Sequence, residues 1–232
     1  MYCPTEKKWI CVELPVYQYD NALDLQHELV DARKNEIIDS NIVLLLEHAP
    51  VFTLGRRGGI ENLRVSKDFL EKLNIPIIQI ERGGNITFHG PGQLVVYPIV
   101  DLKKAKLQVL EFVEGLEEVM IRIADEWGIT AEHNLINRGI WVGNNKLGSV
   151  GISVRRDICF HGFALNVNGS LKPFDWINPC GLEGVGMTSM EQELSKRVPM
   201  NRVRKSVKGH LEAVFGVKLV LKNLSELLSI IE

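Results

Sequence analysis

The sequence has few cysteines and no apolar segment long enough for a membrane helix. Its four cysteines are irregularly spaced, and none of them forms a C-x-x-C pair. This pattern argues against a disulfide framework. A membrane helix needs about 20 consecutive apolar residues, and no such run is present. The first residues, MYCPTEKKWICVEL, lack the apolar stretch of a secretory signal. We therefore expect a cytoplasmic protein without a membrane partner.

An excess of one charge is also missing. There are 27 Lys and Arg residues against 29 Asp and Glu residues, which gives a formal net charge of -2. This balance is unlike that of a nucleic-acid-binding protein. The six histidines show neither H-x-x-x-H nor H-E-x-x-H spacing. No metal site is expected from local pattern, although ligands distant in the sequence stay open.

The composition is that of an ordinary globular protein, with 45% hydrophobic and 24% charged residues. The length suits a single catalytic domain over residues 1–232. Residues 196–232 carry the least diagnostic pattern, and we expect them to form a helix and strand extension.

Strands and helices are expected to alternate without regular βαβ units. Apolar patterns predict strands over 8–14, 41–47, 75–81, 94–102, parts of 139–167 and 217–221. Predicted helices cover 20–38, 66–74, 107–127, a short segment after 188 and 201–215, with caps at Asp20, Ser66, Thr188 (with Glu191) and Asn201. The sequence thus predicts an α+β fold with a mixed, mostly antiparallel sheet flanked by helices.

A glycine-rich segment between two predicted strands is the first candidate for chemistry. Residues 82–92 hold four glycines and one proline together with Arg82, Thr87 and His89. Glycine lets a ligand approach the main chain closely, so a binding loop is favoured over a structural turn. The segment matches neither a P-loop nor a dinucleotide-binding motif. The shorter GRRGG segment at 55–59 reads equally well as a solvated basic turn.

Three later segments hold further candidates. Lys146 follows a predicted hairpin turn in GNNKLGSVG (143–151), and the alternative role is a solvated surface lysine. Residues 161–168, HGFALNVN, suit either a core strand or a pocket wall. Cys180 lies between Pro179 and Gly181, which predicts an exposed cysteine on a stiff turn, as a nucleophile requires. Cys11, by contrast, reads as a buried structural cysteine.

Together, these segments resemble the octanoyl-(acyl-carrier-protein)–protein N-octanoyltransferase family. The matching stretches are RGGNITFHGPGQLVVYP (82–98), GNNKLGSVG (143–151), HGFALNV (161–167) and NPCG (178–181), and EHAPVFTLG (47–55) also fits. The resemblance extends from about residue 10 to about residue 195. It implies the catalytic fold of biotin and lipoate protein ligases.

The resemblance also implies roles for individual residues. Cys180 corresponds to the nucleophile that carries the acyl group, and Lys146 to its acid/base partner. The implied donor is octanoyl-acyl carrier protein, the acceptor is a lysine of a lipoyl domain, and no cofactor is needed. We expect a monomer. The implied acyl-binding residues are Arg82, Gly83, Gly84, Asn85, Ile86, Thr87, Phe88, His89, Ser149, Val150, Gly151, Gly162, Phe163 and Ala164.

Other interpretations stay open at this point. An ATP-dependent lipoate or biotin ligase of the same fold would not require Cys180. A non-catalytic lipoyl-domain binding protein would not require turnover, and a cysteine hydrolase would need His161 or His89 as its base. The arginines at 56, 57 and 64, or at 155 and 156, are either a dock for an acidic carrier protein or ordinary solvated charges.

Overall fold

A nine-stranded mixed sheet forms the centre of the protein. The computed structural model describes residues 7–134, 137–178 and 186–231. The strand order is β12-β1-β2-β6-β10-β9-β8-β7, and β11 pairs with β9. Pairing is parallel for β12-β1, β1-β2 and β11-β9 and antiparallel elsewhere, which confirms the predicted fold class. The strands are β1 Lys7–Tyr17, β2 Asn41–His48, β6 Gln93–Asp101, β7 Glu132–His133, β8 Gly139–Val142, β9 Asn145–Arg155, β10 Ile158–Asn166, β11 Gly186–Met187 and β12 Val217–Lys222.

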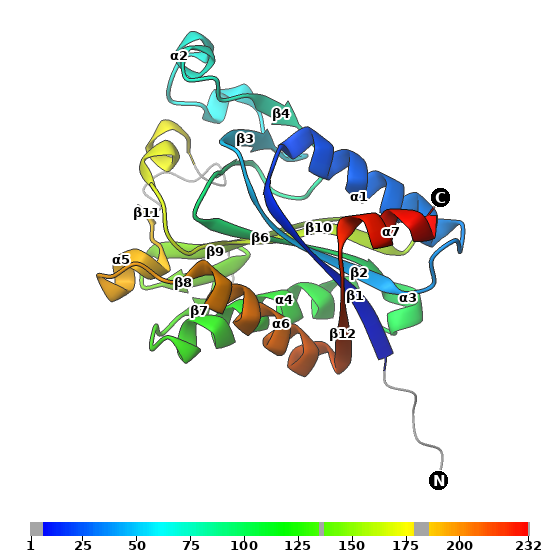
Figure 1. Cartoon of the computed structure of the whole chain (residues 1–232). Coiled ribbons are helices and arrows are strands. Elements are labelled where there is room, and N and C mark those ends of the chain that lie inside the picture. The colour runs from blue at the N-terminus through cyan, green and yellow to red at the C-terminus, as the bar shows by residue number, and fades with distance from the viewer. Residues whose placement is uncertain (1–6, 135–136, 179–185, 232) are drawn as a thin grey trace.

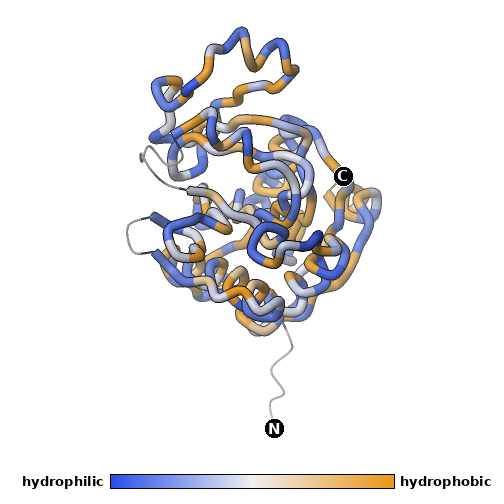
Figure 2. Tube along the Cα trace, turned by 90° about the vertical axis from the view of Figure 1, so that its left-hand side faces the viewer, coloured by the Kyte–Doolittle hydropathy of each residue, from blue (hydrophilic) through white to orange (hydrophobic). Residues whose placement is uncertain are grey.

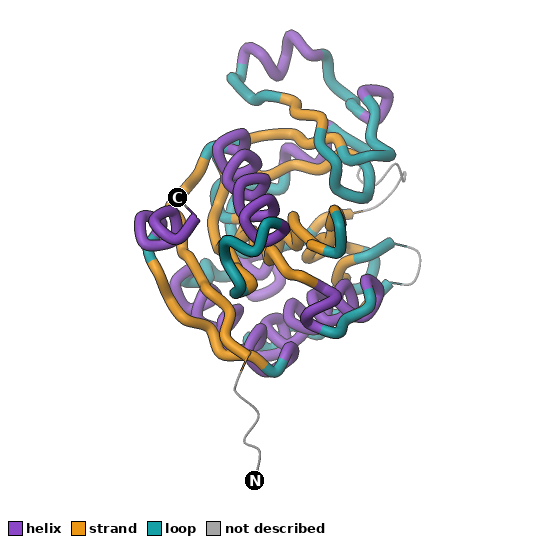
Figure 3. Tube along the Cα trace, turned by 90° about the vertical axis from the view of Figure 1, so that its right-hand side faces the viewer, coloured by secondary structure: helices purple, strands orange, loops and turns teal. Residues whose placement is uncertain are grey.

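Helices cover both faces of this sheet, as Figures 1 and 3 show. On one face lie α1 (Tyr19–Lys34) and α7 (Leu224–Ile231), and on the other lie α4 (Val109–Glu126) and α6 (Met200–Phe215). The continuous apolar run of β2 follows from this arrangement. Its residues 42, 44 and 46 pack toward α1, and its residues 43 and 45 pack toward α4, so both faces need apolar side chains.

A smaller three-stranded sheet lies at one end of the molecule, together with a short helix (Figure 1). It consists of β3 (Val51–Leu54), β4 (Ile77–Gln79) and β5 (Ile86–His89), and it carries α2 (Lys67–Lys72) and the 3-10 turns Ile60–Asn62 and Lys172–Trp176. The prediction of a glycine-rich loop over residues 82–92 is therefore wrong for residues 86–89, which form strand β5. Ile86 and Phe88 alternate into a small apolar core, and this alternation gives the segment its strand character.

Helix ends were the least accurate expectation. The cap at Ser66 is confirmed, because its Oγ accepts from Phe69 N at 3.2 Å. Asp20 is not a cap: α1 begins one residue earlier after Gln18. The helix also ends at Lys34 and not at residue 38. The buried Arg33 explains this end, since its guanidinium donates to Ile38 O at 2.6 Å and fixes the following turn.

Two further cap predictions are wrong by one or two residues. Ser189, and not Thr188, caps the short helix α5 (Met190–Leu194) by accepting from Gln192 N. The Thr188 hydroxyl bonds instead to the Glu193 carboxylate. Helix α6 begins after Pro199, whose fixed φ suits a helix start, rather than at Asn201.

Residues 196–231 contribute directly to the main sheet and to the helices that cover it. Strand β12 pairs in parallel with β1, from Lys7 opposite Val217 to Val12 opposite Lys222. Helix α6 buries three apolar residues of one face against α4: Val203, Val207 and Leu211. Hydrophilic and hydrophobic residues are interspersed along the coloured part of the trace in Figure 2. No described helix is long and apolar enough to span a bilayer.

Gly162 offers a test of the sheet geometry. A Cβ at this position would lie 2.6 Å from Pro98 Cδ and would also meet the backbone of Val96. We expect Gly162→Ala to lower the free energy of unfolding by about 1–3 kcal/mol. Gly209→Ala, in helix α6 with open space around its Cβ position, should raise it by about 0.5–1 kcal/mol. Urea unfolding measures both, and equal stability of Gly162→Ala and wild type would contradict this packing.

Candidate active site

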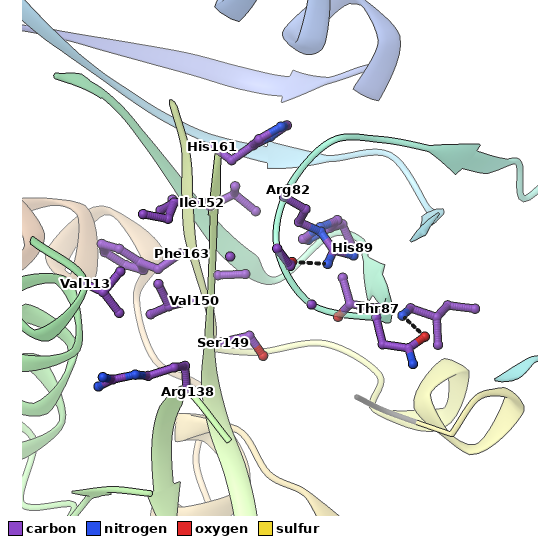
Figure 4. A pocket seen from close by; sticks show the side chains of 18 of the residues that line it. Arg82, Thr87, His89, Val113, Arg138, Ser149, Val150, Ile152, His161 and Phe163 are labelled. Atoms are coloured by element: carbon purple, nitrogen blue, oxygen red, sulfur yellow. Dashed lines mark hydrogen bonds between the residues drawn. The ribbon is translucent and has the colours of Figure 1, made fainter. Parts of the chain in front are cut away.

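A cavity of about 610 Å³ lies between the main sheet and the Arg82–His89 segment. Figure 4 shows Arg82, Thr87 and His89 on one side, and Ser149, Val150, Ile152 and Phe163 on the strands of the other side. The size is typical of a pocket for a small organic ligand. The cavity brings together three of the predicted segments and Lys146. Of the fourteen predicted binding residues, all but Phe88 line it; Phe88 packs in the small apolar core.

Small residues on two paired strands leave room for this cavity. Ser149 lies opposite Ala164, and Gly151 lies opposite Gly162. A Cβ on Gly151 would lie 3.1 Å from Arg82 Cδ, so glycine also lets the Arg82 segment approach the strand. Gly83 N donates to Ile152 O at 2.9 Å and ties the two together. The two sides of the cavity are therefore joined directly at Gly83 and Ile152.

Arg82 is a buried structural cation at the edge of the pocket. The residue is only 8% exposed. Its Nη2 donates to Thr53 O at 2.8 Å and to Thr53 Oγ1 at 2.7 Å. Nη1 donates to Gly83 O at 3.0 Å. Through these bonds the guanidinium links β3 to the glycine-rich segment, and it orders the backbone that lines the cavity.

The closed end of the pocket, lined by Tyr19, Tyr97 and His89, is polar, and the Arg82 guanidinium beside it carries a positive charge. His48 Nε2 and the Tyr97 hydroxyl are 2.7 Å apart, and His48 Nδ1 lies 3.0 Å from Tyr17 O. Burial lowers the pKa of His48 to about 4 and that of His89 well below its usual range. Both rings are therefore neutral at pH 7. Tyr19, His48 and Tyr97 were not predicted as site residues, because they come from strands and a helix that read as ordinary core.

His161 lies at a break in the sheet. The antiparallel register places it opposite Pro98, which has no N–H to donate. His161 takes a left-handed φ of 57°, and its own N–H donates to Gln26 Oε1 at 2.9 Å. Its ring stacks on Phe160 at 4.8 Å and lines the cavity, where neither ring nitrogen has a hydrogen bond. The bend re-aims a side chain that regular alternation would direct to the other face.

A half-exposed carboxylate links this histidine to the surface. Glu81 Oε2 lies 3.7 Å from His161 Nε2, and Glu81 Oε1 lies 2.6 Å from His27 Nε2. His161 and, to a lesser extent, His27 lower the pKa of Glu81 to about 2. Burial in turn lowers the pKa of His161. Glu81 is thus an anion that orients two imidazole rings.

Lys146 is buried at the opposite end of the cavity, with 2% of its surface exposed. Its Nζ donates to Asn137 Oδ1 at 2.7 Å and lies 5.3 Å from the centre of the Trp141 ring. The interpretation as a solvated surface lysine is therefore wrong. Lysine is almost never fully buried without a specific reason, and a buried lysine in a pocket is a candidate for proton transfer.

Cys180 lies outside the described residues, and so do its neighbours from 179 to 185. The described chain on one side ends at Asn178, whose N donates to Asn62 O at 2.8 Å. On the other side, Gly186 pairs with Asn145 and Met187 pairs with Lys146. Cys11 is fully buried, as predicted, and burial raises the pKa of its thiol to about 12, which makes it unreactive.

Buried hydrogen bonds connect the motifs that line the pocket. His89 Nδ1 and Gln93 Oε1 are 2.7 Å apart, and Gln93 Nε2 donates to Asn166 Oδ1 at 2.9 Å. Asn166 Nδ2 donates to Thr188 O at 3.0 Å, and Thr188 N donates to Lys146 O at 3.0 Å. This His89-to-Lys146 chain explains why Gln93 and Asn166 recur in the motifs without lining the cavity wall.

The arginines considered as a dock are exposed in both places. Arg56, Arg57 and Arg64 lie on the small-sheet side, where Arg57 also lines the cavity. Arg155 and Arg156 lie at the turn between β9 and β10. Arg138, which was not predicted, lines the cavity near Lys146. Among the described residues, no three His, Cys, Asp or Glu side chains are placed to share a metal ion.

Comparison with known proteins gives consistent relatives. Residues 18–212 match the family model "Lipoyl protein ligase A/B catalytic domain". The chain is 44% identical to the octanoyltransferase of Desulfotalea psychrophila over 215 residues, covering 92% of this chain and 96% of that protein. It is 42% identical to the octanoyltransferase of Syntrophobacter fumaroxidans over 209 residues, covering 90% of this chain and 91% of that protein.

Solved structures with the same fold are more distant in sequence. A lipoate-protein ligase A bound with ATP superposes with a TM-score of 0.76 at 14% identity, covering 97% of this chain and 92% of that one. A biotin protein ligase from Aquifex aeolicus, in complex with biotin and ATP, gives a TM-score of 0.56 at 14% identity, covering 90% of this chain and 71% of that one. These likenesses establish the fold and confirm the fold that the sequence motifs implied.

The neutral histidines predict a loss of stability in mild acid. The pKa of His48 is lowered from 6.5 to about 4, so the unfolded chain binds this proton more readily. The stability that depends on neutral His48 is then fully present above the unfolded pKa of 6.5, and it is lost as the pH falls toward the folded pKa of about 4. We expect His48 to account for about 2 kcal/mol of the loss between pH 7 and pH 5.

Urea unfolding across this pH range measures the effect. His48→Gln should flatten the dependence on pH by about this amount. Tyr97→Phe removes the hydroxyl partner and keeps the titrating ring, so it should lower stability at every pH and retain the slope. An unchanged slope in His48→Gln would overturn the assignment.

Proposed function

Because the chain belongs to the lipoyl protein ligase A/B catalytic-domain family, and within it to the octanoyltransferases, we propose that it transfers an octanoyl group from acyl carrier protein to a lysine of a lipoyl domain. The observation that carries the proposal is a buried lysine, Lys146, at one end of a cavity of about 610 Å³. The strand wall of this cavity combines small residues (glycine, alanine and serine) with the apolar side chains of Val150, Ile152 and Phe163. Such a wall suits an unbranched acyl chain.

In the first half-reaction, the Cys180 thiolate attacks the thioester carbonyl of octanoyl-acyl carrier protein. A bond forms between Sγ and the carbonyl carbon, and the carbon–sulfur bond to the carrier breaks. The carrier thiolate leaves and takes up a proton from the Lys146 ammonium, which leaves Lys146 neutral for the second half-reaction. A nearby ammonium favours the reactive thiolate of cysteine, and Lys146 supplies that charge. Support for this pairing comes from β11, which re-enters the described structure next to Lys146 directly after the segment that contains Cys180.

In the second half-reaction, the lysine amine of a lipoyl domain attacks the octanoyl thioester on Cys180. Neutral Lys146 accepts the proton that the attacking amine loses, and Cys180 leaves as a thiolate while an amide forms. A positioned acid or base of this kind typically contributes a factor of about 10²–10⁴ to the rate. The thioester provides the driving force, so the route uses neither a nucleotide nor a metal.

The oxyanion of each step needs hydrogen-bond donors in a preorganised position. Strand β8 pairs with β9 only as far as Ser149, opposite Gly139. Beyond this point, along the described part of β9, Gly83 N donates to Ile152 O on the edge that β8 no longer covers. Because successive backbone groups of a strand point to opposite sides, the Val150 N–H faces this edge and the Gly151 N–H faces β10. We assign this edge as a source of donors, together with the backbone at Gly181.

The decisive experiment is intact-protein mass spectrometry after incubation with octanoyl-acyl carrier protein in the absence of ATP. We expect one octanoyl mass on the protein that hydroxylamine removes, and its transfer to an added apo-lipoyl domain. Cys180→Ser should form no hydroxylamine-sensitive adduct. Lys146→Met should slow transfer by about 10²–10⁴-fold, whereas Lys103→Met, on the exposed surface, should behave like wild type.

Other outcomes support the other interpretations. Modification of the acceptor only with octanoate and ATP would make the protein a ligase. Tight binding of the lipoyl domain without turnover would make it a binding protein. Release of free octanoate without an acceptor would make it a hydrolase.

If the strands of the cavity bind the acyl chain, a larger side chain on them should shift the preference of the enzyme toward shorter acyl chains. Ala164 lines the cavity opposite Ser149 and is 7% exposed. We expect Ala164→Leu to fill part of the cavity, lowering kcat/KM for octanoyl thioesters by about 10–100-fold and that for butyryl thioesters far less. Steady-state kinetics with thioesters of both lengths measures the ratio. Equal losses for both lengths would remove Ala164 from the acyl-binding wall.

A further inference from the structure

We infer that Asn137 is a positioning residue for Lys146, and that its uncharged amide sets the pH range in which Lys146 exchanges its proton. The inference rests on the proposed function, in which Lys146 must alternate between ammonium and amine. Asn137 was not singled out from the sequence, since a lone asparagine in a polar segment reads as a turn residue.

The contact between these two side chains is short and directional. Lys146 Nζ donates to Asn137 Oδ1 at 2.7 Å. The backbone of the same asparagine is also engaged, because Trp141 Nε1 donates to Asn137 O at 3.1 Å, and the Trp141 ring lies beneath the Lys146 ammonium. One residue thus fixes both the acceptor for the lysine and the aromatic ring that supports it.

A buried carboxylate holds the segment that carries Asn137. Glu117, from helix α4, is 0% exposed and accepts from Gly139 N at 2.6 Å. It also interacts with Arg138 Nη1 at 3.1 Å and His133 Nδ1 at 3.3 Å. Its two oxygens are therefore occupied by groups on either side of Asn137. The carboxylate orders the segment, and the amide contacts the lysine.

The choice of an amide has a chemical consequence. A carboxylate beside a lysine favours the ammonium form by direct charge attraction, typically by about 1–3 pH units. An amide oxygen accepts the same hydrogen bond without carrying a full charge. The lysine is then held in place, and its ammonium form is favoured less than it would be beside a carboxylate, which suits a group that must also act as a general base.

The other charged groups around the cavity agree with this assignment. On the side of α4, the charged or titratable groups are Glu114, Glu117, Arg138 and His133, and both carboxylates pair with Arg138. Arg57 and Arg82 face the cavity from the small-sheet side, and His161 lies in β10. Among the described lining residues of the cavity, none is an aspartate or a glutamate.

The test replaces the amide by a carboxylate of the same size. We expect Asn137→Asp to move the pH–rate profile for transfer from preformed octanoyl-enzyme to the lipoyl domain by at least about 1 pH unit toward higher pH. At pH 7 the rate should fall by about tenfold and recover at higher pH. Asn137→Ala should slow transfer without a displacement to higher pH, because it removes the contact and adds no charge.

The matched control is Asn144→Asp. It makes the same chemical change two residues from Lys146, on the exposed hairpin turn, and should leave rate and profile close to wild type. Thermal unfolding of each variant checks that folding is intact. If Asn137→Asp and Asn137→Ala slow transfer equally with an unmoved profile, Asn137 has only a structural role and the inference is wrong.

A second measurement does not depend on turnover. The ¹³Cε chemical shift of Lys146, assigned by comparison with Lys146→Met, follows loss of its proton directly. We expect the titration midpoint in Asn137→Asp to lie at higher pH than in wild type, and an identical midpoint would overturn the inference. If the wild type forms no acyl-enzyme but the midpoint still moves, the proposed function fails while the pairing of Asn137 with Lys146 stands.

Discussion

The buried hydrogen-bond chain from His89 to Lys146 is the constraint on which the pocket depends. It joins β5, β6 and β10, through Thr188 directly after β11, to Lys146 in β9, and each of its links is 2.7–3.0 Å long. A buried amide that loses one partner leaves a donor or acceptor unsatisfied at a cost of about 1–3 kcal/mol. Gln93 and Asn166 can therefore take only one arrangement, and this arrangement keeps the two walls of the cavity in register.

A second constraint acts at the closed end of the cavity, where the pairing of β6 with β10 is interrupted at Pro98 and His161. Pro98 has no N–H to donate to the neighbouring strand, and His161 takes a positive φ. Gly162 has no Cβ, which would otherwise collide with Val96 and Pro98. In an uninterrupted sheet this region would be filled by alternating apolar side chains. At the break, a cavity takes the place of part of that apolar packing. The backbone N–H of His161 is satisfied there by a side chain, since it donates to Gln26 Oε1.

The sequence allowed the layers and most of the residues that line the cavity to be predicted. The continuous apolar run of β2 and the cap at Ser66 follow from neighbours along the chain. The lining residues, Gly151 and Gly162 among them, were assigned through the resemblance of their motifs to a known family. The residues that were missed depend on contacts across the fold. His48 comes from a strand that reads as core, and Asn137 gains its role only because Glu117, 20 residues earlier, fixes its segment. No periodicity or spacing connects such residues before the fold is known.

The distribution of charge along the cavity fits acyl transfer better than the handling of a charged substrate. At the closed end the histidines are neutral, because burial lowers their pKa values, and Glu81 is turned toward His27 and His161 rather than into the space that the strands leave. At the other end lies a lysine whose bonded partner is an amide. The Arg82 cation at this end already donates to Thr53 and Gly83, so an apolar chain can enter beside it without separating the charge from these partners. In the proposed mechanism, the reacting thioester and amine then meet Lys146, the group that changes its protonation state.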